Sequence, residues 1–365
     1  MADDNDDSDS ATWGESCRPV AISEGGRIVT FSQDMDSLFQ SGGPSPAPAG
    51  IPLGQVTEIC GAAGTGKTTL ALQLALDVQM PPAFGGAGGG ALYVDTEGGF
   101  FPERLNELAI ALSTHVTRQA ARLTEGGDEL VAGVAPAALV RNVRVYRATT
   151  IEALAAAVEA IPRLIATEAS AAREKGSGGG GGNGNATALP LLPVRLVIID
   201  SVALHLRHVL APMDAGARVR ATATLGAALH SLAMTAGVAV VVINHVTTKI
   251  ASHSGGGGSG SVVGISLAAA TATLGPTDAR ALSLDGASSD VTRLVPALGD
   301  VWAHVPSARL WLGWLGGKRV AAIDKTILTT TTNAGSGSGS VSSRPVAFFS
   351  ITTAGVRKAL TVRGK

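Results

Sequence analysis

Gly61-Ala62-Ala63-Gly64-Thr65-Gly66-Lys67-Thr68 is the segment of this sequence that says most about its fold. It fits the phosphate-loop pattern G-x-x-x-x-G-K-[ST], and it stands between an apolar run at Val56–Cys60 and a helical stretch at Lys67–Gln79. In such a loop the glycines allow backbone N–H groups to face a phosphate, and the helix N-terminus adds a partial positive charge. Lys67 would then reach the β- and γ-phosphates, and Thr68 would ligate Mg²⁺. We therefore predict a site for ATP with Mg²⁺.

Around this loop, β-branched runs alternate with Ala/Leu-rich stretches, which is typical of one α/β domain with a mostly parallel sheet flanked by helices. Five apolar runs are predicted as buried parallel strands: Val56–Cys60, Ala91–Asp95, Val143–Tyr146, Leu196–Asp200 and Val238–Asn244. Three later runs are predicted as antiparallel strands at one edge of the sheet: Ala308–Trp314, Arg319–Ile323 and Val346–Ile351. Four helices are predicted: Lys67–Gln79, Pro102–Ser113, Ile151–Ala172 and Ala217–Ala236.

The composition indicates a folded protein without a membrane span. Of 365 residues, 45% are apolar, 16% are charged and 4% are aromatic, so an aliphatic core is expected and wholesale disorder is excluded. No apolar run approaches the about 18 residues of a spanning helix, and five aspartates among the first ten residues have the wrong charge for a signal or transit peptide. Cys17 and Cys60 cannot form a disulfide framework or a zinc site. We expect a soluble protein that is not exported.

Glycine- and serine-rich segments interrupt the chain and are interpreted as flexible loop insertions. The expected organisation is an acidic disordered segment at residues 1–26, an ATPase domain at 27–358 and a tail at 359–365. The main insertions are expected at 176–187, 254–290 and 329–343. Gly42–Gly50 and Gly85–Gly90 are interpreted in the same way.

Two acids follow predicted strands and are candidates for work on a phosphate. Asp200 ends a strand and would lie beside the metal ion through a water molecule, although many acids at such positions only start turns. Glu97, in Asp95-Thr96-Glu97-Gly98, would leave the carboxyl edge of the sheet near the γ-phosphate and polarise an attacking water. The alternative for Glu97 is a helix-capping acid ahead of Pro102.

Over roughly Arg27–Lys358 these residues resemble the eukaryotic RecA-like DNA strand-exchange recombinases. Besides the phosphate loop, the likeness rests on Thr57-Glu-Ile-Cys-Gly61, Asp95-Thr-Glu-Gly98, Phe101-Pro-Glu-Arg104, Asp200-Ser201 and Asn244-His-Val-Thr-Thr-Lys249. Within the family the sequence looks like the C paralogues, on the features Asp77–Pro81 with Phe84-Gly-Gly86, Arg207-His208 and Leu294–Gly299 followed by Trp302. The resemblance implies a RecA-type P-loop NTPase core that binds ATP between neighbouring subunits.

The resemblance also implies DNA and protein partners. Two loops, at about His205–Val219 and Thr247–Arg293, would contact single-stranded and branched DNA. The candidates for phosphate contact are Arg207, His208, Arg218, Arg220, Lys249 and Arg293, although each taken singly could be a solvated surface charge. The expected protein partners are other recombinase paralogues in a hetero-oligomer and the main strand-exchange recombinase, in the nucleus and without a membrane.

Further site residues come from the same likeness. Thr69 and Arg104 would join the nucleotide site. His245 stands where most relatives have glutamine and would sense the γ-phosphate in a pH-dependent way. Lys325 would act in trans on a neighbour's ATP, unless it is an ordinary exposed lysine at a strand end. The candidate catalytic residues are thus Lys67, Glu97, His245 and Lys325.

Three functions remain open from the sequence. The first is a DNA-dependent ATPase in homologous recombination repair, including meiotic recombination and the processing of branched (Holliday junction) intermediates. The second is an ATP-gated scaffold subunit with little hydrolysis of its own. The third is a small-molecule P-loop kinase, which would need an arginine-rich lid, whereas the Gly/Ser insertions hold almost no arginine. The family's small N-terminal helical domain is expected to be absent.

Overall fold

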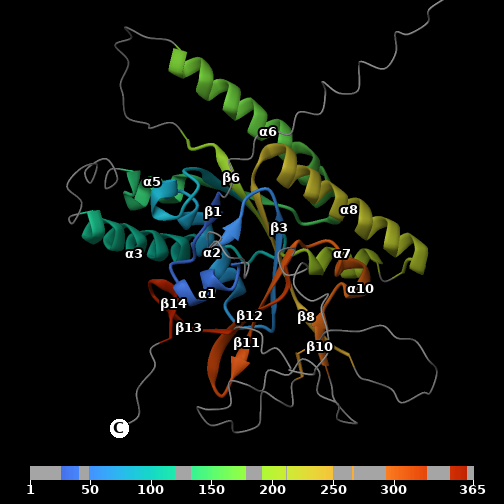
Figure 1. Cartoon of the computed structure of the whole chain (residues 1–365). Coiled ribbons are helices and arrows are strands. Elements are labelled where there is room, and N and C mark those ends of the chain that lie inside the picture. Colours follow the sequence, from blue (N-terminus) through green and yellow to red (C-terminus); the bar gives the residue numbers. More distant parts are fainter. Residues whose placement is uncertain are drawn as a thin grey trace, which may run out of the picture.

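The computed structural model describes residues 26–40, 49–120, 133–177, 191–210, 212–249, 265–266, 293–326 and 346–359. Its centre is a nine-stranded sheet in the order β14-β13-β12-β11-β3-β7-β6-β4-β5 (Figure 1). The predicted acidic segment, the three predicted main insertions, Gly42–Gly50 and the tail lie wholly or mostly outside the described residues. Among the described residues, no helix is both long and apolar enough to cross a membrane.

One side of the sheet is parallel and the other is antiparallel. The parallel strands are β3 (Val56–Gly61), β7 (Ala239–Asn244), β6 (Val194–Asp200), β4 (Gly90–Asp95) and β5 (Val143–Arg147). On the other side, β11 runs parallel to β3, and three strands then follow in antiparallel pairing. These elements are β11 (Ala308–Leu315), β12 (Lys318–Thr326), β13 (Val346–Thr352) and β14 (Gly355–Lys358). The predicted mostly parallel sheet with antiparallel edge strands is confirmed.

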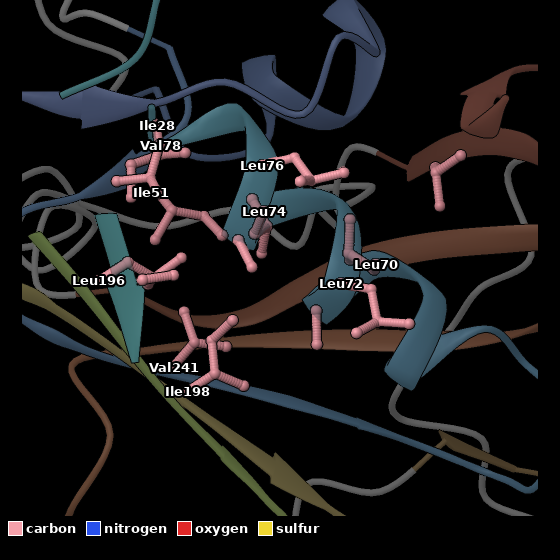
Figure 2. Close-up of a cluster of buried hydrophobic side chains, with 14 of the residues drawn as sticks. Ile28, Ile51, Leu70, Leu72, Leu74, Leu76, Val78, Leu196, Ile198 and Val241 are labelled. Atoms are coloured by element: carbon pink, nitrogen blue, oxygen red, sulfur yellow. The ribbon is translucent and has the colours of Figure 1, made fainter. Parts of the chain in front are cut away.

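Helices cover both faces of this sheet (Figure 1). One face is covered by α2 (Lys67–Asp77), α3 (Pro102–Ala120) and α5 (Pro136–Arg141), and the other by α6 (Ile151–Ser177), α7 (Ala203–Leu210) and α8 (Ala215–Ala236). Successive strand residues alternate between the two cores, because Leu196 and Ile198 pack with α2, whereas Val197 and Ile199 pack with α6 and α8. Figure 2 shows Leu70 and Leu74 of α2 in one cluster with Ile198 and Val241.

Several short elements were not predicted from the sequence. They are β1 (Arg27–Ile28), α1 (Gln33–Ser37), β2 (Ile51–Pro52), the 3₁₀ turn η1 (Pro82–Phe84), α10 (Gly299–Trp302) and a small sheet of β8 (Val246–Lys249), β10 (Arg293–Pro296) and β9 (Ile265–Ser266). In the small sheet, β10 pairs antiparallel with β8, so that Arg293 stands opposite Lys249. The two ends of the second predicted DNA loop are therefore paired strands.

Gly85–Gly90 is not a flexible insertion, so that prediction was wrong. The Gly85 carbonyl accepts from the Val29 N–H at 2.9 Å, and the Ala87 N–H donates to the Val78 carbonyl at 2.9 Å. A Cβ atom on Gly86 would stand 2.0 Å from the Met80 carbonyl oxygen. Glycine is needed here because the chain passes too close to another backbone for a side chain.

Candidate nucleotide-binding site

The phosphate loop joins β3 to α2, as the sequence predicts. Gly64 and Gly66 have φ angles of 73° and 106°, in the left-handed region that favours glycine. A Cβ atom on Gly61 would stand 2.3 Å from the Leu312 carbonyl oxygen, and one on Gly66 would stand 2.3 Å from the Ile351 side chain. The glycines therefore let the loop fold tightly against β11 and β13. Ala62, Ala63 and Gly64 form its exposed part.

Lys67 begins α2 and turns its ammonium back over the loop. Its Nζ donates to the carbonyl oxygens of Gly61 at 2.8 Å and Ala62 at 2.9 Å. The residue is only 7% exposed, and this burial lowers the pKa of the Lys67 ammonium below its ordinary value. A buried ammonium held beside a glycine-rich loop suits the phosphates of a nucleotide.

Thr68 and Asp200 are brought together from α2 and β6. The Thr68 hydroxyl donates to Asp200 Oδ2 at 2.9 Å, and the Tyr93 hydroxyl donates to the same oxygen at 2.6 Å. Burial raises the pKa of the Asp200 carboxyl above its ordinary value. Hydroxyl and carboxylate oxygens are ligands that Mg²⁺ prefers, so this pair fits the predicted metal ion. Thr69 follows on the same helix and is partly buried.

Glu97 lies just beyond β4, at the same edge of the sheet as Asp200, because Asp95 and Asp200 are paired in register on the parallel strands β4 and β6. Its Oε1 accepts from the Ser201 hydroxyl and from His245 Nε2, the latter at 3.0 Å. The hydrogen bond from His245 is the main reason that the pKa of Glu97 lies below its ordinary value. The structure thus joins two predicted site residues, Glu97 and His245, directly.

Behind the loop lies a buried polar network that the sequence analysis missed. Glu58 of β3 is 0% exposed and forms an ion pair with Arg309 of β11. Its Oε1 accepts from Asn244 Nδ2 at 2.6 Å and from Trp302 Nε1 at 2.9 Å. The available signal was a glutamate inside the apolar run Val56–Cys60, since a charge in a buried strand needs partners.

Arg104 sits at the start of α3 and contacts the turn between β13 and β14. Its guanidinium donates to the carbonyl oxygens of Thr352 at 2.6 Å and Thr353 at 3.0 Å, and it pairs with Glu107 at 2.6 Å. Its predicted contact with the nucleotide remains a prediction.

The first predicted DNA loop is mostly helical. Arg207 is exposed on α7, and Arg218 and Arg220 are exposed on the first turns of α8. The interpretation of His205–Val219 as one loop was therefore wrong. For His208, Lys249, Arg293 and Lys325 only the backbone lies within the described part of the chain, and Lys325 stands opposite Arg309 in the pairing of β12 with β11.

Known proteins resemble this chain over much of its length. Residues 24–124 match the family model described as Rad51. The chain is 30% identical over 302 residues to DNA repair protein RAD51 homolog 3 of Cricetulus griseus. The aligned region covers 82% of this chain and 63% of that protein. The chain is 25% identical over 299 residues to the Dictyostelium discoideum protein of the same name, with coverage of 82% and 60%.

A third relative is DNA repair and recombination protein RadA of Metallosphaera sedula, which is 30% identical over 181 residues, or 50% of this chain and 40% of the relative. The chain thus spans less than two thirds of the length of each of these relatives. Together with the phosphate loop and the sheet order, these matches confirm the predicted resemblance to the RecA-like recombinases, the group that includes Rad51 and its paralogues.

Proposed function

We propose that this chain is an ATP-dependent, DNA-binding recombinase paralogue that acts in homologous recombination repair of double-strand breaks. The observation that carries the proposal is the convergence at one sheet edge of Lys67, the Thr68–Asp200 pair and the partly exposed carboxylate of Glu97. The relatives are DNA repair and recombination proteins by name, which supports repair rather than the small-molecule kinase alternative.

Each of these groups has its own task in ATP hydrolysis. Lys67 and the loop N–H groups would hold the phosphates, and Thr68 with Asp200 would hold Mg²⁺. When bound, Mg²⁺ would neutralise phosphate charge. Glu97 would orient an attacking water and take up its proton. His245, which contacts Glu97, is proposed to sense whether the γ-phosphate is present.

A second candidate function, the ATP-gated scaffold, is favoured by one observation. Glu97 Oε1 is engaged by both Ser201 and His245, which would slow hydrolysis if the contacts persisted with ATP bound. The chain would then bind ATP to stabilise an assembly of paralogues and would hydrolyse little of that ATP. Action in meiosis and on Holliday junctions is part of the same proposal for the whole protein.

Two variants separate these functions. Lys67→Ala should weaken ATP binding by about 10- to 100-fold, because a charge-assisted contact is worth about 1.5–3 kcal/mol. Glu97→Gln should keep ATP binding and lose about 10²- to 10⁴-fold in single-turnover hydrolysis. Glu103→Gln, on the exposed side of α3, is the matched control. If Glu97→Gln hydrolyses ATP like the parent protein, the proposal of a DNA-dependent ATPase gives way to that of an ATP-gated scaffold.

DNA binding is proposed to use the exposed arginines of α7 and α8 together with Lys249 and Arg293. Affinity for single-stranded DNA should fall with salt by about 0.7 log units per log unit of salt for each phosphate contact. Arg218→Ala should flatten that slope by about one contact. Arg118→Ala, exposed on α3 on the opposite face of the sheet, should leave the slope unchanged. Equal slopes in all three proteins would contradict this binding surface.

The proposed partners are other recombinase paralogues, the main strand-exchange recombinase and branched DNA, in the nucleus. Lys325 is proposed to reach a neighbour's ATP. Lys325→Ala should keep its own ATP affinity and lower the ATP-dependent stability or turnover of the mixed assembly. A pull-down from nuclear extract, with and without ATP and single-stranded DNA, would identify the partners that the chain retains.

A further inference from the structure

Asp95 makes a group of hydrogen bonds that the proposed hydrolysis does not use. It ends β4, is 3% exposed, and its Oδ1 accepts from three consecutive backbone N–H groups. The donors are Glu97 at 3.2 Å, Gly98 at 2.7 Å and Gly99 at 3.1 Å. Gly98 has a φ of 77°, so the chain turns sharply inside this set of bonds.

Asp95, which carries this carboxylate, is held in the sheet by neighbouring strands on both sides of β4. Asp95 pairs with Asp200 of β6 and with Arg147 of β5, and its carbonyl accepts from the Ala148 N–H at 2.9 Å. Thr96, the next residue, exchanges two hydrogen bonds of 2.7 Å with the backbone of Ser201. The backbone of Glu97 is therefore held from both sides.

We propose that Asp95 is a positioning residue that holds the Glu97 carboxylate at the phosphate site. The inference rests on the role proposed for Glu97. Asp95 does not act on the ligand, because Oδ1 is occupied by the turn and Oδ2 faces Arg147 Nη1 at 3.9 Å. Without an acceptor at this position, three backbone N–H groups in partly buried hydrogen bonds lose their partner, and the turn that carries Glu97 loosens. Displacing a reacting group by about 1 Å can cost about 10²-fold in rate.

The test compares Asp95→Ala with Asp95→Asn, because asparagine keeps an oxygen where three N–H groups need one. Asp95→Ala should lower single-turnover hydrolysis of ATP by about 10²-fold, with ATP affinity within about twofold of the parent protein. Asp95→Asn should recover most of that loss. Glu103→Ala, an acid on α3 that is exposed to solvent, should change neither quantity.

Amide hydrogen exchange of Glu97, Gly98 and Gly99 provides a second measurement that does not depend on hydrolysis. Exchange at these amides should be fast in Asp95→Ala and slow in the parent protein and Asp95→Asn. Slow exchange in Asp95→Ala, or an asparagine variant as impaired as alanine in both measurements, would overturn the inference. If the parent protein does not hydrolyse ATP, the proposed function fails while the exchange result still decides whether Asp95 holds the turn. Should Asp95→Ala not fold, Asp95→Asn with parental exchange and turnover would support the acceptor role, and Asp95→Asn with fast exchange would overturn it.

Discussion

Glu58 and Glu97 have the same side chain in two contrasting regions of the molecule. Glu58 is fully buried on β3 and is bonded by Arg309, Trp302 and Asn244, which come from three other parts of the chain. The Glu97 side chain is 31% exposed, and its Oε2 makes no hydrogen bond with the residues that the structure describes. Glu58 can therefore only stabilise the fold, whereas Glu97 keeps one oxygen for a ligand.

The largest effect that tests this contrast is expected at Glu58. Glu58→Ala should lower the free energy of unfolding by about 3–5 kcal/mol, because it breaks the buried ion pair with Arg309 and removes the acceptor of Asn244 and Trp302. Glu97→Ala should lower it by less than about 1 kcal/mol, since a partly exposed carboxylate can be replaced by water. Urea unfolding followed by circular dichroism measures both.

The double variant Glu58→Gln, Arg309→Met is the control for the buried ion pair. Removing both charges and keeping the volume should cost less than removing Glu58 alone. If Glu58→Ala destabilises the protein no more than Glu97→Ala does, the buried network is not a stabilising element and the contrast is wrong.

A smaller effect is expected at Trp302, whose indole N–H donates to Glu58 Oε1 at 2.9 Å. Trp302→Phe should lower the free energy of unfolding by about 1–3 kcal/mol, because it removes the donor and leaves part of the buried carboxylate unsatisfied. Trp314→Phe is the matched control, since Trp314 is 43% exposed and its ring lies against the guanidinium of Arg319 at 4.3 Å. Equal destabilisation by the two substitutions would contradict a special role for Trp302.

The two regions also differ in how far they could be predicted from sequence. The grouping of Lys67, Thr68, Glu97 and Asp200 could be predicted because each has a local signal: Lys67 and Thr68 lie in the phosphate loop, and Glu97 and Asp200 lie at or just beyond the ends of apolar strands. Parallel strands place their carboxyl ends at one edge, so strand order alone brings these groups together. The hydrogen bonds of Tyr93 and Ser201 depend on side-chain geometry that no local pattern contains.

The Glu58 network could not be assembled from sequence because its partners are distant in the chain. Asn244, Trp302 and Arg309 lie 186, 244 and 251 residues away from Glu58. A different reason applies to β14 and to the small sheet of β8, β9 and β10: strands of two to four residues carry almost no periodic signal. In contrast, the apolar runs that form β3, β4, β6 and β7 were correctly predicted to be buried parallel strands.

The smallest expected effect concerns protonation of Glu97. The hydrogen bond from His245 is the main cause of its lowered pKa, so Glu97 stays ionised to lower pH than an ordinary glutamate. A group with a lowered pKa in the folded state favours folding above its unfolded-state pKa and loses that contribution as the pH falls through the folded-state value. Because His245→Ala removes this hydrogen bond, the pKa of Glu97 should return toward its ordinary value, and the acid limb of the hydrolysis profile should move toward higher pH.

His245→Gln separates the hydrogen bond from the charge of the imidazole. Glutamine can still donate to Glu97 Oε1, so the acid limb should stay near that of the parent protein. Single-turnover hydrolysis measured as a function of pH in the parent protein and in both variants checks these two expectations. An acid limb that stays in place in His245→Ala would mean that burial and Ser201 set the protonation of Glu97 without His245. In that case Glu97 would resemble Glu58 more closely, because its contacts with the surrounding structure, rather than His245, would determine its behaviour.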